Sequence, residues 1–313
     1  MSLVGGTVLV VALALLLDHC LGEPRRWHPL AGFGRLAAWV EAVLRGKTQS
    51  LRDERAQGLL GWSTLVAVPV LLLVVLLAVL PGVVSSVLAI VVLYCCIGLR
   101  SLQQHAMQVE APLAQGDLSA ARVAVARIVS RDTAELSAEK VSAAAVESVL
   151  ENGSDAVIAP IFWFVVAGAP GALAYRLINT LDAMWGYRNA QYEYFGFVAA
   201  RMDDLANWIP ARICALTYCL MGDFSCGRKA ISEQGAQTDS PNAGRVMAAG
   251  AGALGIEVGG STWHKGKQQW RPRLGFGRPV CREDIGRAVD LLQRGVLFWL
   301  FLGFALVVVS AVA

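Results

Sequence analysis

Polar residues between positions 130 and 212 interrupt a chain that is otherwise strongly apolar, and three of them follow helical spacing. Glu147, Glu151 and Asp155 are four residues apart, so they would share one helical face if the helix continues past Gly153. Carboxylates this close repel one another, and Mg²⁺ would relieve the repulsion because it takes oxygen ligands and substrate phosphates. We interpret the three acids as a magnesium–nucleotide site, with a solvated acidic face as the alternative.

A second group of acids, amides and arginines lies between positions 179 and 212. It comprises Asn179 and Asp182 at i, i+3, then Arg188, then Asp203, Asp204 and Asn207 at the expected start of the next helix, and finally Arg212. Charged side chains beside hydrophobic segments need partners or ligands, and the planar guanidinium suits phosphate and carboxylate. We interpret this group as a functional site; for Asp203, helix capping is the alternative.

A third group, Arg131, Asp132 and Lys140, combines basic residues with an expected helix start near 130–133. Backbone N–H groups at the start of a helix favour anions. The pattern therefore predicts an anion site, and ordinary capping explains it equally well.

The composition is that of a polytopic membrane protein. Hydrophobic residues make up 56% of the 313 residues and charged residues only 16%, and the mean hydropathy is +0.52; soluble domains are nearer 45–50% apolar and about 25% charged. Buried charges in such a protein usually mark a site or a pathway. The net charge of +3 is too small to indicate nucleic acid.

Four apolar runs are long enough to be membrane spans: 3–21, 59–80, 83–99 and 295–313. The first run lacks a basic n-region and a cleavage site, so we expect a retained span and not a signal peptide. Pro81-Gly82 predicts a tight turn that makes the second and third spans a helical hairpin. Runs 157–180 and 205–222 contain polar and helix-breaking residues, and they could cross the membrane or lie as re-entrant or interfacial helices.

The distribution of basic residues predicts the orientation of the chain in the membrane, because cytoplasmic loops carry an excess of Lys and Arg. Segments 23–58, 100–156 and 223–293 carry seven, five and ten Lys and Arg residues, and all three face the cytoplasm if the N-terminus is outside. The polar motifs together are typical of one functional site, so they should lie on the same side of the membrane. We therefore favour an arrangement in which neither ambiguous run crosses fully, so that segment 182–204 also faces the cytoplasm.

The sequence predicts an all-α bundle of transmembrane helices with cytoplasmic amphipathic helices. We expect one integral membrane domain, with N-terminal spans at 1–99, polar-motif catalytic helices at 100–222, a Gly/Pro-rich cytoplasmic loop or subdomain at 223–293 and a C-terminal span at 294–313. Segment 118–152 reads as an amphipathic helix in two pieces, divided near 130–133. Lys140, Glu147 and Glu151 would share its polar face.

Gly250, Gly252 and Gly255 spell GxGxxG, which in a dinucleotide-binding protein follows a strand and opens a helix. The residues before Gly250 are not typical of a strand. Close helix packing or a glycine-rich turn is therefore the better interpretation.

Together these motifs resemble the adenosylcobinamide-phosphate synthase family of cobalamin biosynthesis. The resemblance runs from Asp18 to Ile285 and is densest at 127–212 and at 240–256; the D-x3-GEP…WHP-x4-GR element from Asp18 to Arg35 also matches. The family's acidic-amide stretch, approximately E-x3-EN-x2-D-x2-IAP, corresponds to 147–160, with Gly153-Ser154 where Thr and an apolar residue are common. Segment 263–279 departs more from the family.

The resemblance implies a ligase of the cell inner membrane that condenses adenosylcobyric acid with aminopropanol or its O-phosphate, using ATP and Mg²⁺ on the cytoplasmic side. Partners would be these substrates, membrane lipid and other membrane enzymes of the late cobalamin pathway, and no nucleic acid. The implied roles are metal ligands for Glu147, Glu151 and Asp155, catalysis for Asp182, Arg188, Asp203 and Asp204, and substrate or nucleotide binding for Arg131, Asp132, Lys140, Asn152, Asn179, Asn207 and Arg212. A corrinoid carrier or transporter and a non-catalytic sensor are the alternatives.

Overall fold

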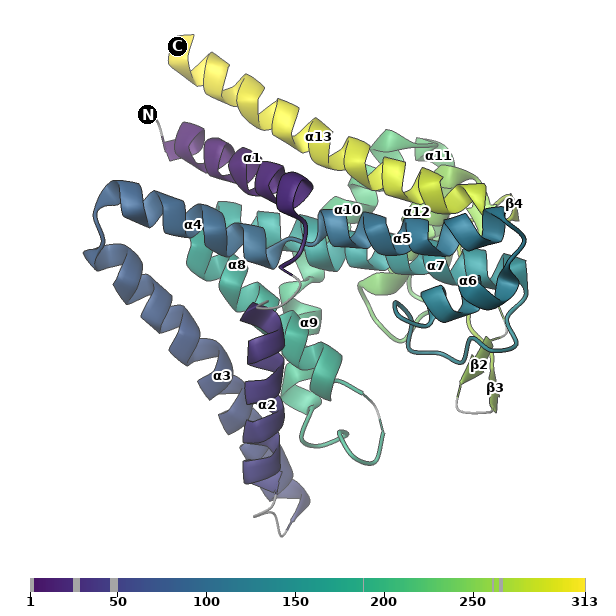
Figure 1. The fold of residues 1–313 in the computed structure, drawn as a ribbon, viewed down its shortest axis with the longest axis horizontal. Coiled ribbons are helices and arrows are strands. Elements are labelled where there is room, and N and C mark those ends of the chain that lie inside the picture. The colour runs from purple at the N-terminus through teal and green to yellow at the C-terminus, as the bar shows by residue number, and fades with distance from the viewer. Residues whose placement is uncertain are drawn as a thin grey trace. The chain divides into compact units, whose positions relative to one another are not determined.

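The structure, a computed structural model, describes residues 3–24, 29–45, 50–187, 189–260, 262–264 and 267–312. It is almost wholly helical (Figure 1). The chain divides into two units, each made of two stretches of sequence. Residues 1–98 and 159–207 form the first unit, and residues 99–158 and 208–313 form the second. Each unit is described by itself.

The first unit packs the early helices around α8. It contains α1 (Leu3–Leu21), α2 (Pro29–Arg45), α3 (Leu51–Val79), α4 (Gly82–Cys96), α8 (Ala159–Trp185) and α9 (Phe197–Ala206). Helix α8 contacts α2, α3, α4 and α9, and α1 packs on α4. The predicted hairpin is confirmed, because α3 ends at Val79 and α4 begins at Gly82 after Pro81.

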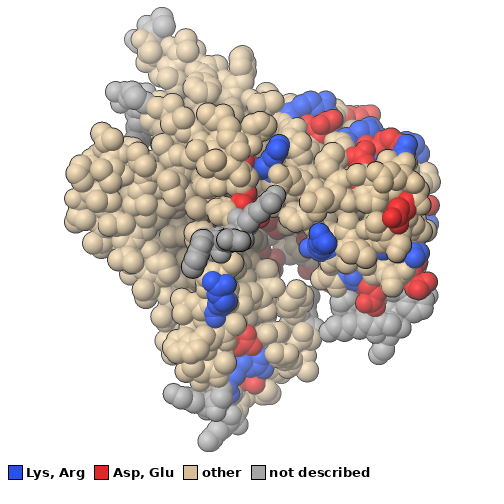
Figure 2. Space-filling model, viewed as in Figure 1, with Lys and Arg blue, Asp and Glu red and all other residues tan. Residues whose placement is uncertain are grey.

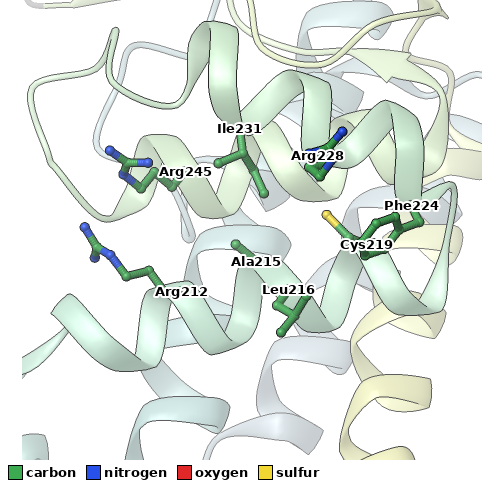
Figure 3. Close-up of a pocket in the computed structure, with 8 residues that line it drawn as sticks. All are labelled: Arg212, Ala215, Leu216, Cys219, Phe224, Arg228, Ile231 and Arg245. Carbon is green, nitrogen blue, oxygen red and sulfur yellow. The ribbon is translucent and has the colours of Figure 1, made fainter.

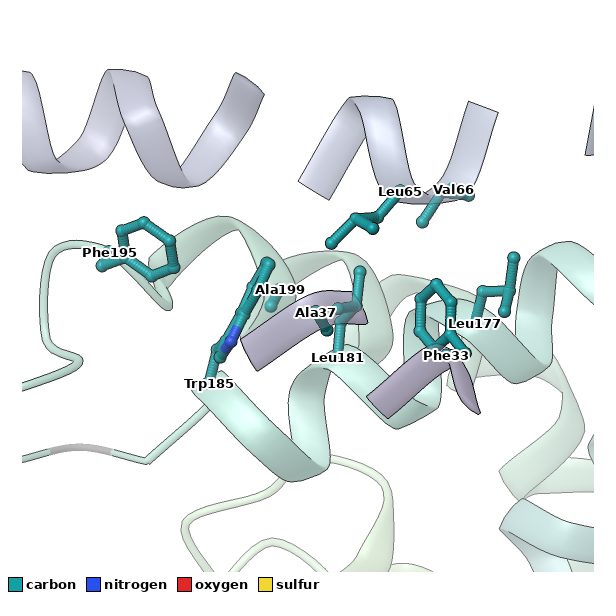
Figure 4. Close-up of a cluster of buried hydrophobic side chains, with 9 residues drawn as sticks. All are labelled: Phe33, Ala37, Leu65, Val66, Leu177, Leu181, Trp185, Phe195 and Ala199. Carbon is teal, nitrogen blue, oxygen red and sulfur yellow. The ribbon is translucent and has the colours of Figure 1, made fainter. Parts of the chain in front are cut away.

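The core of this unit is an aromatic and aliphatic cluster (Figure 4). Trp185 and Phe195 meet edge to face with ring centroids 5.0 Å apart, a favourable aromatic geometry. Both side chains are fully buried. Gly58 lets α3 approach closely, since a Cβ there would lie 2.0 Å from the carbonyl oxygen of Phe195. This packing fixes the end of α8, where the second group of polar residues begins.

Helix α8 is kinked at Ala167 and Gly168, whose backbones leave the helical region. Pro170 explains the break in the turn before it, because its ring lacks an N–H group and would clash with the carbonyl four residues earlier in a continuous helix. Gly168 adopts φ +64°, which glycine accepts at little cost. The break lies inside the ambiguous run 157–180.

The second unit is built around α7 (Ala138–Gly153). The remaining elements are α5 (Leu99–Ala114), α6 (Leu118–Val125), the π-helical turn η1 (Ser154–Ile158), α10 (Trp208–Met221), α11 (Phe224–Gln234), α12 (Ala243–Leu254), β1 (Ile256–Glu257), β2 (Thr262–His264), β3 (Lys267–Gln269), β4 (Arg278–Pro279) and α13 (Glu283–Val312). Helix α7 contacts α5, α6, α12 and α13. The short strands pair as β1 with β4, parallel, and β2 with β3, antiparallel.

Segment 118–152 forms two helices, α6 and α7, as predicted, but α7 is not amphipathic at its centre. Every residue from Val141 to Leu150 is buried. Neighbouring helices cover α7 on all sides, so the side chain that was expected on a polar face, Glu147, is only 3% exposed. A solvated acidic face is therefore wrong for Glu147.

Five helical stretches within the described residues are long and apolar enough to cross a membrane: Val4–Leu21, Leu51–Val79, Gly82–Ala114, Ala138–Trp185 and Glu283–Ala311. They include the four predicted spans. Figure 2 shows the corresponding surface: charged side chains gather over the first turns of α13 and near α6, and the face over α1 and α4 is almost without them.

The two ambiguous runs differ from the clear spans. The stretch Ala138–Trp185 contains the run 157–180 and is interrupted by η1 and by the kink at Gly168. Helix α10, which holds most of the run 205–222, has 14 residues, fewer than the roughly 20 that a span needs.

The segment expected as a Gly/Pro-rich loop region contains two further helices, α11 and α12, and short strands. The GxGxxG sequence lies within and just after α12, so the helix-packing interpretation is confirmed. A Cβ at Gly252 would lie 2.8 Å from the carbonyl oxygen of Cys226 and 2.9 Å from the Cβ of Ala230. Gly255 ends the helix in the left-handed conformation at φ +68°.

We predict that Gly252→Ala destabilises the protein by about 1–3 kcal/mol, the usual cost of forcing extra atoms into a packed core. The thermal unfolding midpoint of the purified protein in detergent measures the effect. Gly6→Ala in α1 is the matched control, because a Cβ there meets nothing within 4 Å. An equal midpoint for Gly252→Ala and the unchanged chain would contradict the close contact of α12 with α11.

Candidate functional site

A buried carboxylate on α7 holds two arginines from distant parts of the second unit. Glu147 Oε2 accepts hydrogen bonds from Arg131 and from Arg271, the latter at 2.9 Å. The carboxylate is 4% exposed, and the guanidinium side chains are 16% and 35% exposed. Such a pair is stable only when hydrogen bonds satisfy the remaining polar atoms. We call Arg131, Lys140, Glu147, Gly259 and Arg271 the Glu147 cluster.

A glycine turn completes the Glu147 cluster. The N–H group of Gly259 donates to Glu147 Oε1 at 2.8 Å, and Lys140 Nζ donates to the carbonyl oxygen of Gly259 at 3.0 Å. Gly259 and Gly260 have φ of +91° and +82°, and a Cβ at Gly259 would lie 2.2 Å from the carbonyl oxygen of Pro272. Only glycine fits this backbone and this close approach.

The Glu147 cluster has an excess of positive charge. It contains three cations and one carboxylate, and the carboxylate is in contact with two of the cations. This arrangement orients guanidinium groups and suits an anion such as a phosphate. The contacts favour a positioning role for Glu147 over the predicted direct ligation of Mg²⁺, because a metal ion there would displace both arginines.

The other two predicted metal ligands do not join Glu147 in a group. Glu151 and Asp155 are half-buried, and the π-helical turn η1 begins just before Asp155, so this residue no longer follows the α-helical spacing. Within the described ranges no three His, Cys, Asp or Glu side chains lie close enough together to hold a metal ion. Half-buried carboxylates are nevertheless suitable oxygen donors for Mg²⁺ when phosphates supply further ligands.

Asn152 has a structural contact on α7. Its Nδ2 donates to the carbonyl oxygen of Ser148 at 2.9 Å, and the Ser148 hydroxyl donates to the carbonyl oxygen of Ile128 at 3.1 Å. These bonds connect α7 to the segment that carries Arg131. The predicted contact of Asn152 with substrate or nucleotide stays a prediction.

The expected helix start at 130–133 is wrong. Helix α7 begins at Ala138, where the Ser137 hydroxyl accepts the N–H of Lys140 at 3.3 Å. Serine is a strong N-cap residue, whereas the 130–133 segment lies in bends before it. Arg131 thus acts through its side chain on Glu147, and Asp132 is exposed.

In the first unit, Asp203 lies in a network of amides. Its carboxylate accepts hydrogen bonds from Asn179 Nδ2 at 3.2 Å and from Asn207 Nδ2 at 3.0 Å. The Tyr175 hydroxyl donates to Asn207 Oδ1 at 2.8 Å, and this bond orients the amide. Tyr175 and Asn207 are buried. The network connects α8 to α9.

The capping alternative for Asp203 and the expected helix start there are both wrong. Helix α9 begins at Phe197, so Asp203 and Asp204 lie near its end and Asn207 is the C-cap residue. Burial raises the pKa of the Asp203 carboxyl above its usual value, the two amides oppose this shift, and the charge of Asp204 adds to it. A carboxylate with a raised pKa is suited to taking a proton.

Asp182 lies one turn after Asn179, near the end of α8, and is half-buried. The following turn needs glycine at position 186, because a Cβ there would lie 1.9 Å from Asp182 Oδ1. Asp204 is also half-buried. Arg188 falls outside the described residues.

Arg212 belongs to the second unit, and its contacts are with residues outside the Glu147 cluster. Its guanidinium stacks on Trp208 at 4.0 Å from the ring centroid and donates to Asn242 Oδ1 at 3.3 Å. The predicted residues therefore divide as follows. Asn179, Asp182, Asp203, Asp204 and Asn207 lie in the first unit, and Arg131, Asp132, Lys140, Glu147, Glu151, Asn152, Asp155 and Arg212 lie in the second. That they serve one site stays a prediction.

Sequence reasoning missed Arg271, Gly259 and Tyr175. Arg271 and Gly259 lie more than 100 positions from Glu147, and no local spacing connects them to it. Tyr175 gave a weak signal, since a tyrosine four residues before Asn179 shares its helical face.

Helices that span a membrane and a buried cluster of arginine, lysine and glutamate define a multi-pass helical membrane protein with an interior polar site. The family model described as CobD/Cbib protein matches residues 11–292. The chain therefore belongs to the CobD/CbiB family.

Three relatives show how extensive the similarity is. Cobalamin biosynthesis protein CobD of Stutzerimonas stutzeri is 52% identical over 287 residues, which are 92% of this chain and 93% of the relative. The protein of the same name from Chromobacterium violaceum is 50% identical over 301 residues, 96% of each chain. Cobalamin biosynthesis protein CbiB of Salmonella arizonae is 34% identical over 311 residues, 91% of this chain and 93% of the relative. No solved structure matches the chain.

Proposed function

We propose that this protein acts in cobalamin biosynthesis as an ATP-dependent ligase that joins adenosylcobyric acid to aminopropanol or its O-phosphate through an amide bond. The family membership supports the pathway. The observation that carries the reaction class is the Glu147 cluster, which gathers three cations, two of them bonded to a buried carboxylate. Phosphoryl transfer needs such cations around the developing negative charge.

The proposed chemistry has two steps. A corrinoid carboxylate oxygen attacks the γ-phosphorus of ATP, so an acyl phosphate forms and ADP leaves. The amine nitrogen then attacks the acyl carbon and phosphate leaves, while a base takes the proton of the amine. Mg²⁺, when bound, would neutralise phosphate charge, and Glu151, Asp155, Asp182 and Asp204 are carboxylates of a suitable type.

The chain's own residues have distinct roles in this proposal. Arg131, Lys140 and Arg271 stabilise phosphate charge, and Glu147 positions the two arginines. Asp203 is the candidate base, because its pKa is raised and two amides orient it. Glu147 is thus a positioning residue, and its loss affects the reaction through the guanidinium groups.

The assay that tests the proposal uses the purified chain in detergent with the corrinoid acid, the amine, ATP and Mg²⁺. Formation of ADP together with an amidated corrinoid supports the ligase. Binding of the corrinoid without turnover, under conditions in which a relative is active, instead supports the carrier or the sensor.

We predict that Asn179→Leu shifts the acid limb of the pH–rate profile to higher pH. Asn179 donates to the Asp203 carboxylate and lowers its pKa, so the variant raises this pKa further. The base must be deprotonated, and a higher pKa therefore requires a higher pH for the same rate. The pH dependence of kcat/KM measures the shift. Thr180→Val is the control, because the Thr180 hydroxyl is next to Asn179 and donates to the Arg176 carbonyl oxygen. An unshifted limb in Asn179→Leu would exclude Asp203 as the base.

We also propose that the protein lies in the inner membrane with segment 182–204 on the cytoplasmic side. A Cys20→Ser background removes the exposed native thiol, and Gln191→Cys adds an exposed one. We expect Gln191→Cys to react only with a reagent that enters the cell. Gly82→Cys, in the hairpin turn, should react from outside. Labelling of Gln191→Cys by an impermeant reagent would place the segment outside and oppose the proposed topology.

A further inference from the structure

A cavity of about 150 Å³ lies between α10, α11 and α12 of the second unit (Figure 3). Three arginines, Arg212, Arg228 and Arg245, line it together with apolar side chains. Figure 3 shows the Arg212 and Arg245 side chains side by side at one end, with Ile231 and Leu216 in the middle. Arg228 lies at the other end, near Phe224 and Cys219, so the cavity has a pair of cations at one end, a single cation at the other and apolar side chains between them.

The charges of this cavity are not balanced by acids. Within the part of the chain that the structure describes, none of the three guanidinium groups has an ion pair with Asp or Glu. Burial, and then the positive charge of Arg245, lower the pKa of Arg212. Uncompensated cations beside one another are stabilised by an anion, and a phosphate matches the guanidinium geometry.

The exposed surface next to the cavity is apolar. Trp208, Arg212, Leu216 and Leu220 are four residues apart along α10, so they lie on one face. Trp208, Leu216 and Leu220 are 52%, 47% and 45% exposed, and Phe224 at the start of α11 is 46% exposed. A helix too short to span, with exposed apolar residues, a tryptophan and a basic side chain, is typical of the membrane interface.

These features distinguish between three sources of phosphate. The cavity has room for a phosphate group, and the exposed apolar surface beside it suits acyl chains better than the polar ribose and base of a nucleotide. A small phosphate ester that also carries an ammonium group would bring a further cation to the arginines, and no carboxylate is among the described residues that line the cavity. An anionic lipid places its phosphate at the arginines and its acyl chains on the exposed apolar residues.

We propose that this cavity binds the phosphate of an anionic phospholipid, with the phosphate between Arg212 and Arg245 and the acyl chains over Leu216 and Phe224. The lipid anchors α10 at the membrane interface. Basic pockets beside membrane helices recognise lipid head groups by this chemistry. The site does not depend on the proposed ligase activity, and binding is measured without corrinoid or ATP.

The test measures lipid binding to the delipidated protein in a neutral detergent by native mass spectrometry. We expect phosphatidylglycerol to bind roughly tenfold or more tightly than phosphatidylcholine, whose ammonium group meets the arginines. Arg212→Gln with Arg245→Gln should weaken phosphatidylglycerol binding by about tenfold or more, because each basic residue contributes several-fold to the affinity. Lys229→Gln is the matched control, since it removes the same charge from α11 but does not line the cavity.

Two results would overturn the proposal. One is equal affinity of phosphatidylglycerol for the double variant and the unchanged chain. The other is displacement of the lipid by inorganic phosphate or ethanolamine phosphate at similar concentration, which would assign the cavity to a small phosphate ester. Arg245→Gln alone, at a half-buried position, provides a milder variant if the double variant unfolds.

Discussion

Replacing Asp203 or Asp182 by alanine lowers amide formation by about 10²–10⁴-fold, the usual contribution of a positioned acid or base. Asp203 is held by Asn179 and Asn207, and its raised pKa suits it to accept the proton of the amine. Asp182 lies one turn further along α8, beside a turn that only glycine fits. Both variants should still insert into the membrane, because neither residue belongs to the hydrophobic cluster around Trp185.

The measurement is the rate of amidated corrinoid formation by purified variants at equal concentration. Asp203→Asn separates charge from shape, since the amide keeps the size of the side chain and loses only its negative charge. We expect it to be as inactive as Asp203→Ala and as stable as the unchanged chain. Glu193→Gln, an exposed acid of the same unit, is the control and should retain full activity. Turnover at the unchanged rate in Asp182→Ala and Asp203→Ala would refute the assignment.

Glu147→Gln should destabilise the protein by about 3–5 kcal/mol, the cost of removing one partner from a buried ion pair. Arg131 and Arg271 both lose their carboxylate, and the Gly259 N–H group loses a charged acceptor. The effect is large because the carboxylate is 4% exposed and water cannot replace it. A surface ion pair, by comparison, contributes at most about 1 kcal/mol.

Unfolding in detergent, followed by circular dichroism with heat or denaturant, measures this loss. Glu139→Gln on the same helix is the matched control, because Glu139 is exposed. In the fraction that remains folded, we expect a raised KM for ATP, since the guanidinium groups are no longer oriented. A Glu147→Gln protein with unchanged stability and unchanged KM would show that the Glu147 cluster is neither structural nor part of the nucleotide site.

The sequence by itself determined the helical class, the clear membrane spans and the Pro81-Gly82 hairpin, because these depend on apolar length and on local backbone preferences. It also indicated that Gly250, Gly252 and Gly255 pack helices, since no strand pattern precedes them. The family could be read from the order of the motifs along the chain. Apart from the family, which is read from motifs along most of the chain, each of these features is encoded within a few turns of sequence.

Only the tertiary structure decided which side chains meet. Helical spacing placed Glu147 with Glu151 on a polar face, but helices that pack around α7 buried it. The loop after β3 brings Arg271 to it across 124 positions. Likewise Asp203 was expected at the start of a helix, yet it lies near the end of α9 and bonds to Asn179 on α8. Periodicity describes one helix at a time, whereas the partner of a buried charge is set by the neighbouring helices and by the need to satisfy that charge away from water.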